Sequence, residues 1–181
     1  MYDRSALIEL VKTRALRFGK FTLASGKEAN FYLDCRQITL HSRGARLVAE
    51  GMLELLGDEL PDAVGGMALG ADPITAAIIT LADMQGRELK GFIVRKEPKA
   101  HGTGRMIEGP MVSGEQVVIV EDVVTTGGSS LQAIKHCEQF GLEVADVLAI
   151  IDRLEGGAEA FAAQGYRLRS LLTVKDFGIE P

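Results

Sequence analysis

The stretch Val117–Ser130 constrains the fold more than any other part of the chain. Its first four residues are β-branched, which predicts a strand buried on both faces of a sheet. Two carboxylates, Glu121 and Asp122, follow, and the turn Thr125–Ser130 is rich in hydroxyls and glycine. An amphipathic helix is expected next, over Leu131–Phe140. This order is typical of phosphate sites in α/β proteins, because the free N–H groups of a turn and a helix N-terminus attract anions.

Hydrophobic patterns elsewhere in the chain predict strands that alternate with helices. Strands are expected at 63–67, 91–94, 117–120, 144–151 and 168–174, and helices at 42–56, 73–84, 131–140 and 158–164. Asp72 and Pro73 are expected to be the N-cap and the first residue of the second of these helices. Alternation of this kind predicts an α/β fold, with a parallel sheet covered by helices on both faces.

The first 40 residues show a different pattern. Asp3 or Ser5 is expected to cap a first helix, which Phe18–Gly19 would end. Two short strands are expected at 20–23 and 30–33, around a turn at Ser25–Lys27. We therefore expect a single domain over residues 1–181, in which residues 1–40 form a small α+β cap, or hood, and residues 41–181 form the core.

The composition argues against several classes of protein. The 181 residues are 46% hydrophobic and 25% charged, as in ordinary globular domains, and the net charge of −5 disfavours a duplex nucleic-acid partner. Cys35 and Cys137 are far apart, so neither a disulfide framework nor a zinc site is expected. No apolar run approaches the ~20 residues of a membrane span, and the first residues lack the pattern of a signal sequence. We expect a soluble, cytoplasmic protein.

The two acids beside the turn indicate what else binds there. Two other phosphate motifs, the P-loop and Gly-x-Gly-x-x-Gly, do not occur in the sequence. Adjacent carboxylates at the end of a strand can accept hydrogen bonds from the vicinal hydroxyls of a ribose, or hold a hydrated Mg²⁺. The alternative is a solvated acid pair followed by a turn that caps a helix.

The string Ile119–Ser129 resembles the signature that binds phosphoribosyl diphosphate (PRPP) in type I phosphoribosyltransferases. The resemblance implies that family's fold, a parallel sheet flanked by helices with an N-terminal hood. It implies that the two acids bind the ribose hydroxyls, that the turn binds the 5′-phosphate, and that Mg²⁺ is a cofactor, for which no ligand of this chain is directly assigned. The residues of the string that it places at PRPP are Glu121, Asp122, Val123, Val124, Thr125, Thr126, Gly127, Gly128 and Ser129.

Three further segments resemble the orotate phosphoribosyltransferase family. Arg95–Gly102 is similar to its mobile loop, Phe18–Gly26 is similar to its N-terminal segment, and Asp152–Arg153 matches the arginine that binds the orotate carboxylate. The resemblance implies transfer of the 5-phosphoribosyl group from PRPP to orotate, which gives orotidine 5′-monophosphate and diphosphate. In this family the mobile loop reaches into the neighbouring subunit, which implies a homodimer with shared sites.

The same resemblance implies roles for individual residues. PRPP contacts are implied for Arg95, Lys96, Lys99 and His101, and orotate contacts for Thr125 and Arg153. Catalytic roles are implied for Lys99 and Asp122.

Some of these assignments remain open at this point. Arg153 can instead form a surface salt bridge with Asp152 or Glu155. The segment Ala68–Pro73 stands where the family has its diphosphate-binding loop, although Asp72 can also be a plain helix cap.

The chain also departs from the family pattern. Many members have lysine where this chain has Ala24, and some have lysine where it has Gly70. Lys20 or Lys27 are the candidates to compensate. The alternative functions are transfer to another base and regulation by a protein that only binds PRPP.

Overall fold

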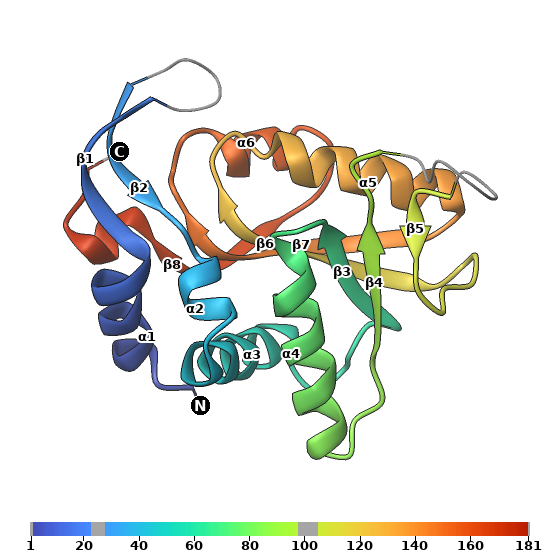
Figure 1. The fold of residues 1–181 in the computed structure, drawn as a ribbon. Coiled ribbons are helices and arrows are strands. Elements are labelled where there is room, and N and C mark those ends of the chain that lie inside the picture. Colours follow the sequence, from blue (N-terminus) through green and yellow to red (C-terminus); the bar gives the residue numbers. More distant parts are fainter. Residues whose placement is uncertain (1, 23–27, 98–104, 181) are drawn as a thin grey trace.

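The computed structural model describes residues 2–22, 28–97 and 105–180 of the chain (Figure 1). Its centre is a six-stranded sheet in the order β5-β4-β3-β6-β7-β8. The strands are β3 (Ala63–Met67), β4 (Lys90–Val94), β5 (Ile107–Glu108), β6 (Gln116–Val124), β7 (Glu143–Asp152) and β8 (Leu168–Thr173). Every neighbouring pair is parallel except β4 and β5, which are antiparallel. The predicted α/β fold with a mostly parallel sheet is confirmed.

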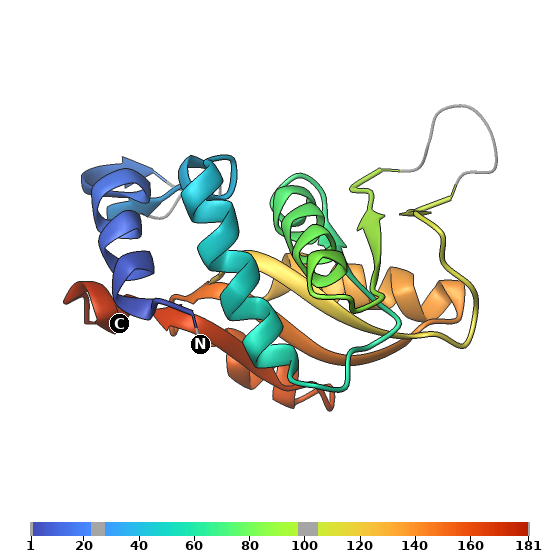
Figure 2. The same ribbon diagram turned by 90° about the horizontal axis from the view of Figure 1, so that it is seen from below.

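Helices cover both faces of the sheet, as Figure 2 shows from below. One face carries α1 (Arg4–Leu10), α3 (Ser42–Leu56) and α4 (Ala71–Met84), and the other carries α5 (Gly128–Phe140) and α6 (Gly157–Ala162). Two clusters of buried apolar side chains fill the two interfaces. None of the helices in the described part of the chain is both long and apolar enough to cross a bilayer.

The strand that carries the two acids is longer than predicted. β6 runs from Gln116 to Val124, so Glu121 and Asp122 lie within it and not after its end. The reason is its pairing with β7, which continues to Val124, whereas its pairing with β3 ends at Ile119. The expected end of the strand at residue 120 was therefore wrong, because pairing on one side alone is enough to extend a strand.

The N-terminal region contains the expected helix and two strands, but the boundaries differ from those predicted, because both strands begin earlier. Asp3 caps α1 and its Oδ1 accepts a hydrogen bond of 2.9 Å from the Ala6 N–H. After α1 the chain forms a π-helical segment, Val11–Ala15, and then β1 (Leu16–Thr22), which pairs antiparallel with β2 (Glu28–Leu33).

The predicted helix end at Phe18–Gly19 was wrong, because both residues belong to β1. The strand begins earlier because Leu16 pairs with Leu33, and both side chains are buried. The predicted turn at residues 25–27 lies outside the described residues.

Three short elements were not predicted, and helix α4 begins two residues earlier than expected. The unpredicted elements are α2 (Arg36–Thr39), β5 and the 3₁₀ segment Val174–Phe177. Asp72 was expected to be the N-cap of α4, but the N-cap is Gly70 and Asp72 lies in the first turn. Pro73 tolerates this position, since the first N–H groups of a helix have no partner within the helix.

The turn after β6 is packed tightly against α6. Gly127 has a φ of 80°, and a Cβ at this position would lie 2.9 Å from Cζ of Phe161. A side chain is also excluded at Gly157, since a Cβ there would lie 2.4 Å from Cγ1 of Val124. Phe161 itself is fully buried. Helix α6 therefore packs directly against the turn between β6 and α5 and helps to fix its conformation.

We expect Phe161→Ala to lower the free energy of unfolding by about 3–5 kcal/mol, because it leaves a cavity beneath the turn. Phe18→Ala is the matched control, since Phe18 is 70% exposed and its removal should change stability by no more than about 0.5 kcal/mol. Urea denaturation of both variants measures the difference. Equal losses in the two variants would contradict the packing described for α6.

Candidate active site

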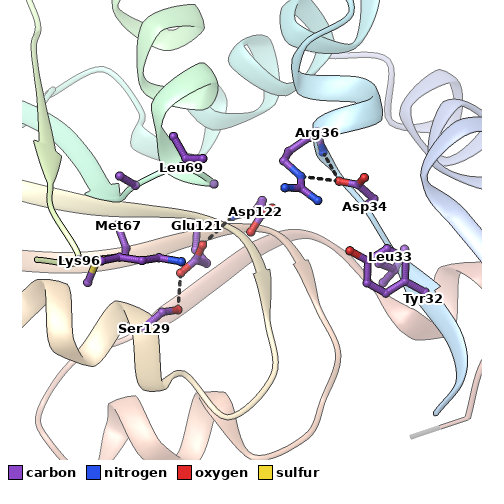
Figure 3. A pocket seen from close by; sticks show the side chains of 12 residues that line it. Tyr32, Leu33, Asp34, Arg36, Met67, Leu69, Lys96, Glu121, Asp122 and Ser129 are labelled. Atoms are coloured by element: carbon purple, nitrogen blue, oxygen red, sulfur yellow. Dashed lines mark hydrogen bonds and ion pairs between the residues drawn. The ribbon is translucent and has the colours of Figure 1, made fainter. Parts of the chain in front are cut away.

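A cavity of about 250 Å³ lies at the carboxyl ends of β3 and β6 (Figure 3). Three segments form its walls. They are the end of β2 with the turn before α2, the loop 68–70 after β3, and β6 with the first turn of α5. Lys96, which follows β4, also lines the cavity. The chain leaves the neighbouring strands β3 and β6 for helices on opposite faces of the sheet. Open α/β sheets bind ligands in the crevice at such a point.

Glu121 is the more deeply placed of the two acids. It is 6% exposed, and its Oε2 accepts hydrogen bonds from Oγ of Ser129, at 2.8 Å, and of Ser130, at 2.9 Å. Burial, and secondly the charge of Asp122, raise the pKa of Glu121 to about 7, against the lowering effect of the two serines. Glu121 therefore exchanges a proton near neutral pH and is tied to the start of α5.

Asp122 lies at the surface of the same cavity. Its Oδ1 accepts a hydrogen bond of 2.8 Å from the Val123 N–H. A Cβ at Gly70 would lie 3.0 Å from this oxygen, so the absence of a side chain at Gly70 lets the loop after β3 approach the carboxylate closely. The cavity thus places an accessible acceptor, Asp122, beside a buried one.

The turn after Asp122 has the geometry of an anion site. Gly127 adopts the left-handed conformation and is the N-cap of α5, and Thr126, Gly128 and Ser129 are exposed there. The first N–H groups of a helix have no partner within the helix and carry partial positive charge. The helix was predicted from residue 131 but begins at Gly128, so Ser129 and Ser130 belong to its first turn.

Some of the predicted site residues line the cavity, and others do not. Lys96, Glu121, Asp122 and Ser129 line it together. The predicted residues that do not line it are Arg95, Val123, Val124, Thr125, Thr126, Gly127, Gly128 and Arg153. Lys99 and His101, predicted to contact PRPP, lie outside the described residues.

Arg153 follows β7 and lies against the N-terminal region. It is 7% exposed, and its Nε donates a hydrogen bond of 2.7 Å to Oε1 of Glu155. Its Cζ lies 4.3 Å from the ring centroid of Phe31 on β2, a cation–π distance. The salt bridge with Glu155 is thus present, while Asp152 accepts from the Leu154 N–H instead. Arg153 therefore joins the end of β7 to β2.

Sequence reasoning did not assign three residues that belong to this site. Ser130 holds Glu121, and Asp34 and Arg36 line the cavity from the turn between β2 and α2. The sequence contains part of the signal for Asp34 and Arg36, because both follow closely after the strand predicted at residues 30–33. Glu121 and Asp122 were identified from the same arrangement of polar residues after a predicted strand. Tyr32, at the end of β2, is 38% exposed and also lines the cavity.

The acids of the cavity suit a cation that arrives with a ligand. Among the described residues, no group of three or more His, Cys, Asp or Glu side chains could hold a metal ion. Mg²⁺ is commonly bound by one or two carboxylates together with the phosphates of a substrate. Glu121 and Asp122 match that donor set, so the residues present fit a Mg²⁺ shared with a phosphorylated ligand.

The raised pKa of Glu121 predicts a pH effect on stability. Between about pH 4.3, the usual value for Glu, and about pH 7, the folded protein binds a proton here that the unfolded chain has lost. This contribution to stability is therefore present at low pH and is lost as the pH rises to 7. Glu121→Gln should gain stability relative to the parent protein by roughly 1–3 kcal/mol between pH 4.5 and 7.5.

Urea denaturation of Glu121→Gln and the parent protein at several pH values measures this difference. Glu9→Gln is the control, because the Glu9 side chain is 70% exposed and should show no comparable trend. A difference for Glu121→Gln that stays constant with pH would contradict the assignment.

Comparisons with known proteins agree with this geometry. Residues 36–164 match the family model of the phosphoribosyl transferase domain. The chain is 58% identical to an orotate phosphoribosyltransferase of Rhodopirellula baltica, over 99% of this chain and 96% of that protein. It is 45% identical to one of Aquifex aeolicus, over 97% of this chain and 98% of that protein.

Solved structures give the same result. The structure of orotate phosphoribosyltransferase from Mycobacterium tuberculosis H37Rv in complex with Fe(III) dicitrate has a TM-score of 0.87 and 44% identity, and covers 97% of this chain and 99% of that one. A structure of the same protein in complex with PRPP has a TM-score of 0.82 and 40% identity, with coverage of 97% and 99%. The chain belongs to the orotate phosphoribosyltransferase family of phosphoribosyl transferases.

Proposed function

We propose that this protein transfers the 5-phosphoribosyl group from PRPP to orotate, giving orotidine 5′-monophosphate and diphosphate, a step of UMP synthesis. The observation that carries this proposal is the cavity in which Glu121, Asp122 and Ser129 meet at the ends of β3 and β6. Relatives up to 58% identical over nearly the whole chain are orotate phosphoribosyltransferases, which supports orotate as the acceptor.

The acids act on the ribose. In the transfer the bond from the anomeric carbon to diphosphate breaks and a bond to a ring nitrogen of orotate forms, so positive charge develops on the ribose. Asp122, at the cavity surface, accepts hydrogen bonds from the ribose hydroxyls and places negative charge beside that carbon. Glu121, held by the two serines, supports this position from within β6.

The turn after the acids binds the 5′-phosphate. Residues 125–129 bring the N-terminus of α5 to one end of the cavity, and such a terminus is suited to a phosphate. Val123 and Val124 contribute their backbone as the strand ends. The packing of Gly127 on Phe161 keeps the turn in shape.

The leaving diphosphate requires positive charge. When bound, Mg²⁺ would neutralise charge on the diphosphate, and Glu121 and Asp122 are the residues that would hold it together with the substrate. Arg95, Lys96, Lys99 and His101 belong to the segment proposed to contact the diphosphate, with Lys99 and Asp122 as the catalytic residues. We also propose a homodimer in which this segment serves the neighbouring subunit's site.

Orotate is placed between the hood, residues 1–40, and the core. Arg153, packed on Phe31, binds the orotate carboxylate with its planar guanidinium, and Thr125 contributes a hydroxyl. The proposed location is the cytoplasm, and the two buried cysteines, which form no disulfide, fit a reducing compartment.

The direct test follows the loss of orotate absorbance in the presence of PRPP and Mg²⁺. We expect orotate to be consumed in preference to uracil, hypoxanthine and adenine. Consumption of one of these bases instead of orotate would indicate a phosphoribosyltransferase for that base. Binding of PRPP without turnover of any base would indicate a PRPP-binding regulator.

We expect Arg153→Ala to raise the KM for orotate roughly 10- to 100-fold, because it removes a charged hydrogen-bond donor, and to leave the KM for PRPP nearly unchanged. Arg169→Ala is the matched control. Its guanidinium is also partly buried and paired with a carboxylate, Asp146, at 2.7 Å, but it lies on β8 and donates to the Leu55 carbonyl of α3, whereas Arg153 lies over Phe31 of β2. Steady-state kinetics with each substrate varied measures both constants. Equal rises in the two constants would remove Arg153 from the carboxylate role.

A further inference from the structure

Arg36 is one of two cations in the described lining of the cavity, and no role has yet been assigned to it. Its described lining contains three carboxylates, Asp34, Glu121 and Asp122, and two cations, Arg36 and Lys96. The loop 68–70, which stands where the family binds diphosphate, is Ala-Leu-Gly and carries no charge. Lys20, one candidate to compensate, is exposed on β1 and does not line the cavity. Among the described residues, Arg36 and Lys96 are therefore the two cations that the cavity itself offers to a ligand with a diphosphate and a second phosphate, in addition to the segment proposed to contact the diphosphate.

Arg36 is held in a defined position at the start of α2. Its Nε donates a hydrogen bond of 2.7 Å to Oδ1 of Asp34, and its backbone N–H donates to the same oxygen at 3.3 Å. Oδ2 of Asp34 accepts from Nε2 of Gln37 at 3.2 Å. Within the described residues, the two terminal nitrogens of Arg36 make no hydrogen bond. Asp34 thus holds one edge of the guanidinium and leaves the other edge available.

The available edge faces the acids of β6. Figure 3 shows the Arg36 guanidinium between Asp34 and Asp122. The hydrogen bond from Asp34 raises the pKa of Arg36, and the charge of Asp122 contributes in the same direction. The side chain is half exposed. It can therefore reach a ligand on Asp122 without leaving Asp34.

The arrangement indicates which part of the ligand it meets. Ser129 and Arg36 lie on opposite sides of Asp122 (Figure 3). A ligand with its 5′-phosphate at the turn near Ser129 and its ribose hydroxyls at Asp122 extends its second charged group toward Arg36 and the loop 68–70. A guanidinium fork binds two phosphate oxygens at once, which a single ammonium group does not.

We infer that Arg36, oriented by Asp34, binds the diphosphate of PRPP in place of a cation in the loop after β3. This inference rests on the proposed use of PRPP but not on orotate as the acceptor. Asp34 holds Arg36 through Nε at 2.7 Å, which favours this pair over an ion pair between Arg36 and Asp122 and leaves Asp122 for the ribose.

The test compares the binding of PRPP and of ribose 5-phosphate, each with Mg²⁺, by calorimetry. Ribose 5-phosphate has the ribose and the 5′-phosphate but no diphosphate. Arg36→Gln should weaken PRPP binding roughly 10- to 100-fold, because a charged hydrogen-bond donor is lost, and should leave ribose 5-phosphate binding within about twofold. Retained ribose 5-phosphate binding also shows that the variant is folded.

Two further variants sharpen the result. Asp34→Asn keeps the charge of Arg36 but weakens its orientation, so it should lower PRPP affinity less than Arg36→Gln. Arg167→Gln is the matched control, because Arg167 is an exposed arginine paired with Asp146 at 3.2 Å and does not line the cavity. It should bind PRPP as the parent protein does.

The inference would be overturned by unchanged PRPP binding in Arg36→Gln. Equal losses for PRPP and ribose 5-phosphate would also overturn it, since they would place Arg36 at the ribose. A parent protein that binds PRPP but does not consume orotate would overturn the proposed acceptor alone, and the comparison of the two ligands would still decide the role of Arg36.

Discussion

The parallel pairing of β6 with β7 is the interaction on which the rest of the site depends. β6 pairs with β3 only as far as Ile119, but with β7 as far as Val124. Beyond Ile119 one edge of β6 is therefore free, and the chain that leaves β3 turns toward α4 on one face while β6 leads to α5 on the other. The cavity occupies the space that this divergence creates. The acids face it because they lie on the part of β6 that only β7 holds.

β6 also holds Glu121 in a position where its negative charge is energetically unfavourable. Glu121 is nearly fully buried beside a second carboxylate, and burial disfavours its charged form. Two serine hydroxyls from the first turn of α5 offset part of this effect. The connection is mechanical as well as electrostatic, because those hydroxyls tie the end of the strand to the start of the helix proposed to receive the phosphate. The proposed sugar-binding and phosphate-binding parts of the site are thereby joined through one carboxylate.

The alternation of strands and helices and the motif of acids and turn could be predicted from the sequence, because both depend on residues close together in the chain. The extent of β6 could not, because it depends on how far β7 runs beside it. The end of the first helix at Phe18–Gly19 was wrong for a similar reason, since Leu16 joins a strand by pairing with Leu33. The roles proposed for Asp34 and Arg36 depend on the end of β2 meeting the ends of β3 and β6 at one cavity, and no local sequence pattern shows that these segments meet. The residues predicted at 99 and 101 remain predictions.

The close packing of Phe161 on Gly127 makes the turn after the acids depend on a residue far along the chain. Phe161 lies beyond a further strand in the chain, yet it sets the space available to the turn that follows the acids. The motif is therefore not a self-contained unit, and moving residues 117–130 into another α/β sheet would carry the side chains proposed to bind the ligand without the support that shapes their turn. The structural unit is β6, α5, β7 and α6 together, and we expect substitutions in α6 to alter the proposed phosphate site without contacting the ligand.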